Sequence, residues 1–163
     1  SGRFNWWTNN QQTRISNNQG QPSYSNGFTL EFWAQNKTAS CSGMFDTGPN
    51  EVNTIRQYSP GGHVEWWSGD PTIAMEMETQ WAHYIVTAKL QQGNRQLATW
   101  KNGASVATGS GNGPQAWNDY CVGTYNYGDP WEGYMAMTAC YDKVLTTSEI
   151  QQNYQALKHR YGL

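Results

Sequence analysis

The sequence predicts an all-β sandwich or barrel that carries one short helix at its C-terminal end. Short segments of alternating apolar and polar residues recur along the chain, separated by turn residues such as those at 59–62 and 102–103. A helical period is clear only beyond residue 145, and strands do not alternate with helices as in a parallel sheet. The chain has 163 residues, of which 14% are aromatic and 13% charged, so we expect one domain over residues 1–163 with its own core.

The strongest strand signal covers residues 28–35, where Leu30 and Phe32 alternate with polar residues such as Glu31. The alternation directs Leu30 and Phe32 to the core and leaves Glu31 outward, as a single acid with no partner nearby in sequence. Trp33 falls on the same outer side as Glu31, and a side chain of that size needs a cover. The C-terminal helix is the candidate for that cover.

The other strands are expected on the same grounds, with loops over 110–114 and 126–131. The Asn-Gly pair at 102–103 predicts a tight hairpin, and the Pro-Gly-Gly run within 59–62 predicts another. These further strands are expected over residues 13–16, 39–46, 52–58, 63–67, 73–78, 81–89, 96–101, 104–108, 119–125 and 133–142.

The C-terminal helix has signals at both of its ends. Thr146 can serve as its N-cap, and Glu149, three residues on, completes a capping box. Lys158 and Arg160 lie where cations suit the helix dipole, and Gly162 can end the helix. The apolar residues of this segment form one helical stripe, made of Ile150, Tyr154, Leu157 and Tyr161.

Three segments carry a resemblance to a known family. The C-terminal segment 131–162 has an aromatic residue, Gly-Tyr-x-Ala, an aromatic-Asp pair, Leu-x-x-x-Glu-Ile and a final Arg-Tyr-Gly. It resembles the end of a laminin-G-like module, of the concanavalin A-like jelly-roll group found in secreted and bacteriophage virion proteins. Residues 27–33 resemble an early strand of that group, and residues 80–84 with 99–103 resemble its central strand and hairpin. Pattern alone leaves jelly roll and immunoglobulin-like sandwich open, and the resemblance implies a jelly-roll sandwich of two antiparallel sheets with one C-terminal helix.

This fold hosts lectins, glycosidases, lyases and inert structural modules, so it leaves the function open. The formal net charge of −2 gives no basic surface for nucleic acid, and no apolar run approaches the length that inserts into a membrane. The chain starts Ser-Gly-Arg without Met, so we expect it to be part of a longer polypeptide.

Catalysis is a weak alternative on this sequence. A glycosidase needs two carboxylates, and laminarinase-like relatives carry an acidic triplet on one strand. Glu76 and Glu78 would share a strand face here, but the third acid and the middle aspartate are missing. The histidines His63, His83 and His159 form no metal or nucleophile motif, so neither a glycosidase nor a polysaccharide lyase is favoured and no catalytic residue is assigned.

Carbohydrate binding is the favoured function. Sugar sites stack an apolar sugar face on exposed aromatic rings and surround it with amides, and this chain is rich in Trp, Tyr, Asn and Gln. The aromatic residues that lie near amides in loops or at outward strand positions are Trp6, Trp7, Trp67, Trp117, Tyr125 and Tyr127. The aromatic residues that match family strands are expected to serve packing; they are Trp33, Trp81, Trp100 and Trp131.

The sequence leaves alternatives for the redox state of the cysteines and for the binding of calcium. The three cysteines Cys41, Cys121 and Cys140 are expected to be reduced and mostly buried, with a Cys121–Cys140 bridge as the alternative. Relatives often hold a structural Ca²⁺, which is possible here but not predicted, because the loop aspartates form no dense cluster. These loop aspartates are Asp46, Asp70, Asp119, Asp129 and Asp142.

The sequence therefore predicts a non-catalytic binding or adhesion module. Its expected partners are a glycan or polysaccharide and the neighbouring domains of a larger virion or extracellular protein. A purely structural virion module, as decoration or fibre domain, is the main alternative.

Overall fold

The structure is a computed structural model, and it describes residues 26–37, 42–46, 54–58, 63–67, 72–76, 78–112, 121–125, 129–131 and 133–163. The strand expected at 13–16 lies outside these residues. The described elements, in chain order, are β1 Phe28–Asn36, β2 Ser42–Asp46, β3 Thr54–Tyr58, β4 His63–Trp67, β5 Thr72–Glu76, β6 Ala82–Gln91, β7 Asn94–Lys101, β8 Ala104–Asn112, β9 Cys121–Val122, β10 Thr124–Tyr125, β11 Asp129–Pro130, β12 Gly133–Tyr141, the helix α1 Thr147–Leu157 and the 3-10 helix η1 Lys158–Tyr161.

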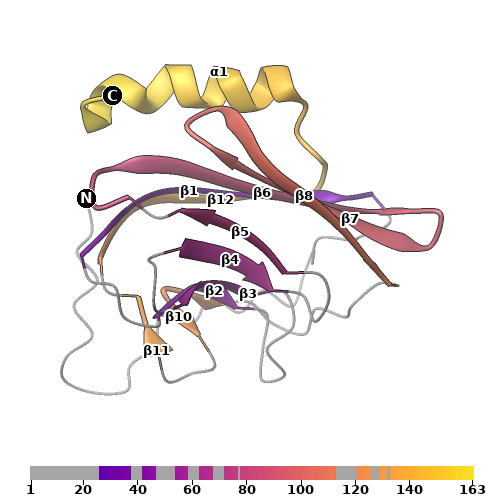
Figure 1. Cartoon of the computed structure of the whole chain (residues 1–163). Coiled ribbons are helices and arrows are strands. Elements are labelled where there is room, and N and C mark those ends of the chain that lie inside the picture. The colour runs from indigo at the N-terminus through magenta and orange to yellow at the C-terminus, as the bar shows by residue number, and fades with distance from the viewer. Residues whose placement is uncertain are drawn as a thin grey trace.

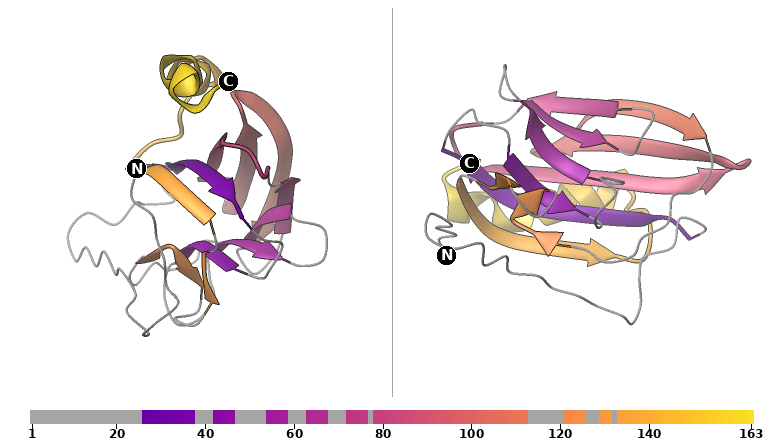
Figure 2. Two further views of the ribbon diagram at one scale, coloured as in Figure 1. Left: turned by 90° about the vertical axis from the view of Figure 1, so that its left-hand side faces the viewer. Right: turned by 90° about the horizontal axis from the view of Figure 1, so that it is seen from below.

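The described strands form two five-stranded antiparallel sheets and one small two-stranded sheet. The first sheet has the order β12-β1-β6-β7-β8, the second has the order β5-β4-β3-β2-β9, and β10 pairs with β11. The first sheet lies between α1 and the second sheet, so the layers run helix, sheet, sheet (Figures 1 and 2). The prediction of an all-β sandwich of two antiparallel sheets with one C-terminal helix is confirmed.

Both predicted hairpins form. β3 pairs with β4 from Tyr58 opposite His63, and β7 pairs with β8 around Asn102 and Gly103, whose φ angles are 51° and 77°. Positive φ at both central residues is the backbone that an Asn-Gly turn supplies. A second turn of this kind joins β6 to β7 at 92–93, where the sequence pattern did not single out a turn.

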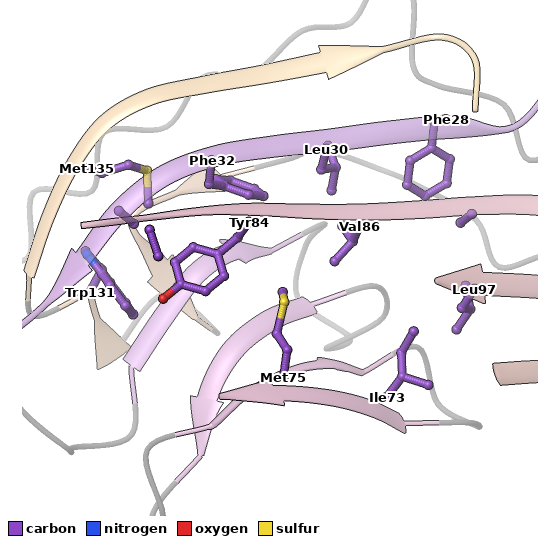
Figure 3. Packing of buried hydrophobic residues seen from close by; sticks show 13 residues of the cluster. Phe28, Leu30, Phe32, Ile73, Met75, Tyr84, Val86, Leu97, Trp131 and Met135 are labelled. Atoms are coloured by element: carbon purple, nitrogen blue, oxygen red, sulfur yellow. The ribbon is translucent and has the colours of Figure 1, made fainter. Parts of the chain in front are cut away.

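The main core fills the space between the two sheets (Figure 3). Alternate residues of the central strands β1 and β6 point into it, as expected from the two-residue period of a strand. Ile73 and Met75 of β5 enter the same cluster from the second sheet. The other residues of this cluster, all but Trp131 on the first sheet, are Phe28, Leu30, Phe32, Ala34, Ala82, Tyr84, Val86, Ala88, Leu97, Trp131 and Met135.

The helix forms as its sequence signals predict. The Thr146 side chain accepts a hydrogen bond from the Glu149 backbone N–H, and the Glu149 side chain accepts one from the Thr146 backbone N–H, so the capping box is complete. The α-helix ends at Leu157 and continues as a single 3-10 turn, which Gly162 closes with a φ of 77°. Lys158 and Arg160 therefore lie in the 3-10 turn, beyond the end of α1.

Several expected boundaries are wrong. β5 ends at Glu76, two residues before the expected end at Glu78. β8 continues to Asn112, into the expected loop 110–114, because it stays paired with β7 up to Asn94. The strand expected at 119–125 is divided at Gly123, and β11 falls within the expected loop 126–131.

Candidate functional site

The most elaborate polar arrangement in the described residues lies between the first sheet and α1. Its centre is the Glu31 carboxylate on β1, which is fully buried. Oε1 accepts from His83 Nε2 at 2.8 Å, and Oε2 accepts from Tyr141 Oη at 2.7 Å and from Asn153 Nδ2 at 2.9 Å. Asn153 Nδ2 also donates to Tyr141 Oη at 3.2 Å. Three elements, β6, β12 and α1, therefore meet at one carboxylate.

Stacked rings cover the side of this network toward the helix end. Trp33 is fully buried and lies between His83, with ring centroids 4.7 Å apart, and Tyr161, with centroids 4.3 Å apart. The Tyr154 ring also stacks with Trp33 and His83, and its centroid lies 6.0 Å from the centroid of each. The prediction that the C-terminal helix covers Trp33 is confirmed.

The environment lowers the pKa of Glu31 and raises the pKa of Tyr141. Burial acts to raise the pKa of Glu31, but the hydrogen bonds from His83, Tyr141 and Asn153 outweigh it and leave this pKa below its ordinary value. Burial, together with the hydrogen bond to Glu31, raises the pKa of Tyr141 to about 12. At neutral pH the cluster therefore consists of an ionised carboxylate facing a neutral phenol.

This cluster is built to hold the helix and not to reach a substrate. Glu31 and His83 have 0% and 1% of their surface exposed, so no solute reaches either group in this state. Glu31 lies on the outer face of β1 as expected, and it has no partner nearby in sequence. The helix covers that face, so the carboxylate is buried and its partners come from distant parts of the chain. One signal in the sequence pointed to this burial. Glu31 lies two residues before Trp33, so both side chains are on the same face of the strand, and a helix that covers Trp33 also covers Glu31.

The carboxylate pair considered for catalysis does not form on one strand. Glu78 lies beyond the end of β5, where its backbone carbonyl accepts from Asn36 N at 3.1 Å and its backbone N–H donates to Tyr84 Oη at 2.9 Å. The Glu78 carboxylate accepts from Lys101 Nζ at 2.8 Å. The chain leaves the strand after Glu76 to cross toward the first sheet, so the expected shared strand face is wrong.

The six aromatic residues predicted to bind sugar are only partly covered by the described structure. Trp6, Trp7, Trp117 and Tyr127 lie outside the described residues, so their role stays a prediction. The backbone of Trp67 ends β4, opposite Thr54 and Thr72, and the backbone of Tyr125 ends β10. Strands β4 and β10 both lie on the side of the first sheet opposite α1 (Figure 1).

The four aromatic residues expected to serve packing do so. Trp131 belongs to the main core with 1% exposure, and Trp33 is stacked between His83 and Tyr161. Trp100 packs against a second, smaller apolar cluster, made of Ile85, Leu145 and Ile150. Trp81 is half-buried and its ring lies 5.0 Å from that of Tyr161, at an interplanar angle of 41°. This prediction is confirmed for all four residues.

The structure also bears on the cysteines and on metal binding. Cys140 is a free, exposed cysteine, so the Cys121–Cys140 bridge is wrong and so is the expected burial of Cys140. Cys121 lies on β9 in the second sheet, whereas Cys140 lies on β12 in the first. Among the described residues, no group of three or more His, Cys, Asp or Glu side chains could hold a metal ion. No helix in this part of the chain is long and apolar enough to cross a membrane.

Solved structures of low sequence identity share this fold. A heptameric SAP-like pentraxin from Limulus polyphemus matches with a TM-score of 0.59 at 16% identity, over 78% of this chain and 69% of the pentraxin chain. Domain 4 of an extracellular arabinanase from Geobacillus stearothermophilus, in complex with arabinotriose, matches with a TM-score of 0.59 at 15% identity, over 78% and 66% of the two chains. The CBM40 of the Ruminococcus gnavus IT-sialidase, bound to α2,3 sialyllactose, matches with a TM-score of 0.56 at 14% identity, over 80% and 84%.

No match was found among curated protein sequences. A family model described as the concanavalin A-like lectin/glucanases superfamily, of the laminin-G type, matches residues 4–151. This match covers nearly the whole chain, and the two antiparallel sheets agree with it. The chain therefore belongs to the concanavalin A-like lectin/glucanases superfamily.

Proposed function

We propose that this domain is a non-catalytic carbohydrate-binding module of a larger extracellular or virion protein. The observation that carries the proposal is the fold itself. The chain belongs to a superfamily of lectins and glucanases, and two of the structures that share its fold hold an oligosaccharide, arabinotriose in one and α2,3 sialyllactose in the other.

The composition supports the same function. Nine Trp and ten Tyr accompany abundant Asn and Gln, while only 13% of the residues are charged. Flat aromatic rings and amides are the groups that bind a neutral polysaccharide, because the rings stack on apolar sugar faces and the amides bond to hydroxyls. The proposed contact residues are those predicted from the sequence, which are Trp6, Trp7, Trp67, Trp117, Tyr125 and Tyr127.

The described geometry favours binding over hydrolysis. The Glu78 carboxylate is engaged by Lys101 at 2.8 Å and lies beyond the strand that carries Glu76. The buried Glu31 and His83 pair is closed to solvent under α1. A glycosidase would need two carboxylates on either side of an open groove, and the described carboxylates do not supply such a pair.

A glycan-array screen of the folded domain tests the proposal. We expect a hit whose signal falls when Trp67 or Trp7 is replaced by Ala, because each replacement removes a stacking surface. Tyr134→Ala is the matched control, since Tyr134 is a half-buried aromatic residue on β12, in the sheet that faces α1. A blank array with a folded, monodisperse sample would contradict sugar binding and favour the structural virion module.

Incubation of the bound glycan with the domain tests the enzymatic alternative. We expect no release of new reducing ends over time. Release that stops in both Glu76→Gln and Glu78→Gln would show that the domain is a hydrolase and would overturn the non-catalytic proposal.

A further inference from the structure

Helix α1 is attached to the sandwich by contacts that are separate from the main core. Its only fully buried residue is Ile150, which packs with Ile85 and Leu145 in a small second cluster. The main core lies between the two sheets, on the side of the first sheet opposite α1. Loss of the helix contacts would therefore leave the inter-sheet core intact, which is the condition for local opening without global unfolding.

The Glu31 carboxylate is the polar contact that joins the middle of α1 to the sheet. An ionised carboxylate only accepts hydrogen bonds, so His83 Nε2, Tyr141 Oη and Asn153 Nδ2 all donate to it. A proton added to Oε1 would face the Nε2–H of His83, and a proton added to Oε2 would be accepted by Tyr141 Oη only after that hydroxyl turns its own O–H away from the carboxylate. Protonation therefore breaks at least one of these hydrogen bonds. Because the site is buried, water cannot replace the lost bond without opening the helix contact.

We propose that α1 is an acid-sensitive clamp, in which protonation of Glu31 detaches the helix from the first sheet while the two-sheet sandwich stays folded. The state produced in acid would expose Trp33 and the His83 ring, which α1 and η1 cover at neutral pH. The clamp is a conformational device of the fold, and it does not depend on sugar binding.

The pH range follows from the direction of the Glu31 shift. The pKa of Glu31 in the folded protein lies below its ordinary value of 4.5, so the carboxylate stabilises the closed helix fully above that value. This contribution is lost as the pH falls below 4.5 and through the folded pKa. We therefore expect the helix to open in acid and to stay closed at neutral pH.

Other ionisable groups face this site and must be separated from Glu31. His83 on β6 donates its Nε2–H to the Glu31 carboxylate at 2.8 Å. Tyr141 on β12 stays neutral in acid, because its pKa is raised to about 12. On the helix side, Lys158 Nζ lies 5.8 Å from the Tyr154 ring centroid.

Glu149 is the second carboxylate that titrates in acid near the helix. Hydrogen bonds from Lys143 and from Thr146 lower the pKa of Glu149 to about 2. It lies in the exposed capping box and does not contact Glu31. Protonation of Glu149 would fray the first turn of α1, whereas protonation of Glu31 would release the helix centre.

Hydrogen exchange of backbone amides, measured by mass spectrometry and corrected for the intrinsic rate at each pH, tests the clamp. Between about pH 7 and about pH 3 we expect the protection of α1 to fall by roughly tenfold or more, while that of β6 and β7 is retained. Simultaneous loss of protection in α1 and β6 would overturn the proposal, because it would mean that acid unfolds the whole domain.

Glu31→Gln supplies the decisive variant, because its amide keeps the shape of the side chain but cannot titrate. We expect weakly protected α1 amides at both pH values and no acid step. Glu149→Gln is the matched control and should keep the acid step at the helix centre. An acid step that survives Glu31→Gln and disappears in Glu149→Gln would assign the effect to the capping box and overturn the proposal.

Asn153→Ala covers the case in which Glu31→Gln does not fold. It removes the helix donor and leaves the bonds from His83 and Tyr141 to Glu31 in place. We expect lower protection of α1 at about pH 7 and a smaller acid step than in the parent. A full parental step in Asn153→Ala would show that Glu31 does not hold the helix through this contact.

Discussion

The two faces of strand β1 are equally buried but are built in different ways. The inner face meets the second sheet and is apolar, with Phe28, Leu30, Phe32 and Ala34 all buried. The outer face meets α1 and carries Thr29, Glu31 and Trp33, each with no exposed surface. Burial alone therefore does not distinguish a core face from a helix-docking face in this fold.

The difference lies in how each face determines the position of its neighbour. Apolar packing depends on volume and shape and tolerates small rearrangements. The side-chain oxygens of Thr29 and Glu31 on the outer face instead bond to partners at fixed distances. Thr29 Oγ1 donates to the Lys143 carbonyl at 2.8 Å and accepts from Leu145 N at 2.9 Å, so one hydroxyl fixes the chain that leads into α1.

The largest effect is expected from a truncation on the inner face. Phe32→Ala removes a fully buried ring from the main core and leaves a cavity, so we expect the free energy of unfolding to fall by about 3–5 kcal/mol. Urea unfolding followed by far-UV circular dichroism measures this change, with Phe32→Leu as the milder control. A loss below about 1 kcal/mol would show that the inner face is not the main source of stability.

A smaller and more local effect is expected on the outer face. Thr29→Val keeps the size of the side chain but leaves the Lys143 carbonyl and the Leu145 N–H without their partner, so we expect a loss of about 1–3 kcal/mol. Amide exchange should show this loss mainly in α1, with β6 almost unchanged. Thr29→Ser keeps the hydroxyl and is the control, and an equal effect of Ser and Val would contradict the role of the hydrogen bonds.

The start of the helix and its apolar stripe could be predicted because their signals are local, whereas the change to a 3-10 turn after Leu157 could not. Thr146 and Glu149 are three residues apart, and the apolar stripe runs from Ile150 to Tyr161. All the residues that predict the helix therefore lie within one short stretch of sequence. The turn at 102–103 was predictable for the same reason. Short-range patterns predict these elements, and contacts with the first sheet then hold α1 in place.

The network around Glu31 could not be predicted because its members are far apart in sequence. Glu31 is separated from His83 by 52 positions, from Tyr141 by 110 and from Asn153 by 122. Only the sheet order β12-β1-β6 and the docking of α1 bring these side chains together. An alternating strand pattern reports which face a residue takes, but it does not report what lies over that face.

The sugar-binding prediction depends on residues of a different kind. Trp33, Trp81 and Trp131 could be assigned to packing because they match strands of the family. Trp67 and Tyr125 were selected by their polar neighbours in sequence, and their backbones lie on β4 and β10. Composition can indicate the chemistry of a ligand, whereas the position of a binding surface depends on the arrangement of loops and strand ends.

The smallest effect is expected at the helix N-cap, where the contact is exposed and local. Thr146→Ala removes the hydroxyl that accepts from the Glu149 backbone N–H, so we expect a loss of about 1 kcal/mol and faster amide exchange in the first turn of α1. Thr147→Ala is the matched control, because Thr147 is the exposed next residue and is not the cap. Restoration of stability by Thr146→Ser would tie the effect to the hydroxyl. If Thr146→Ala instead lowered protection along the whole helix as strongly as Thr29→Val, the two ends of the docking face would act as one unit.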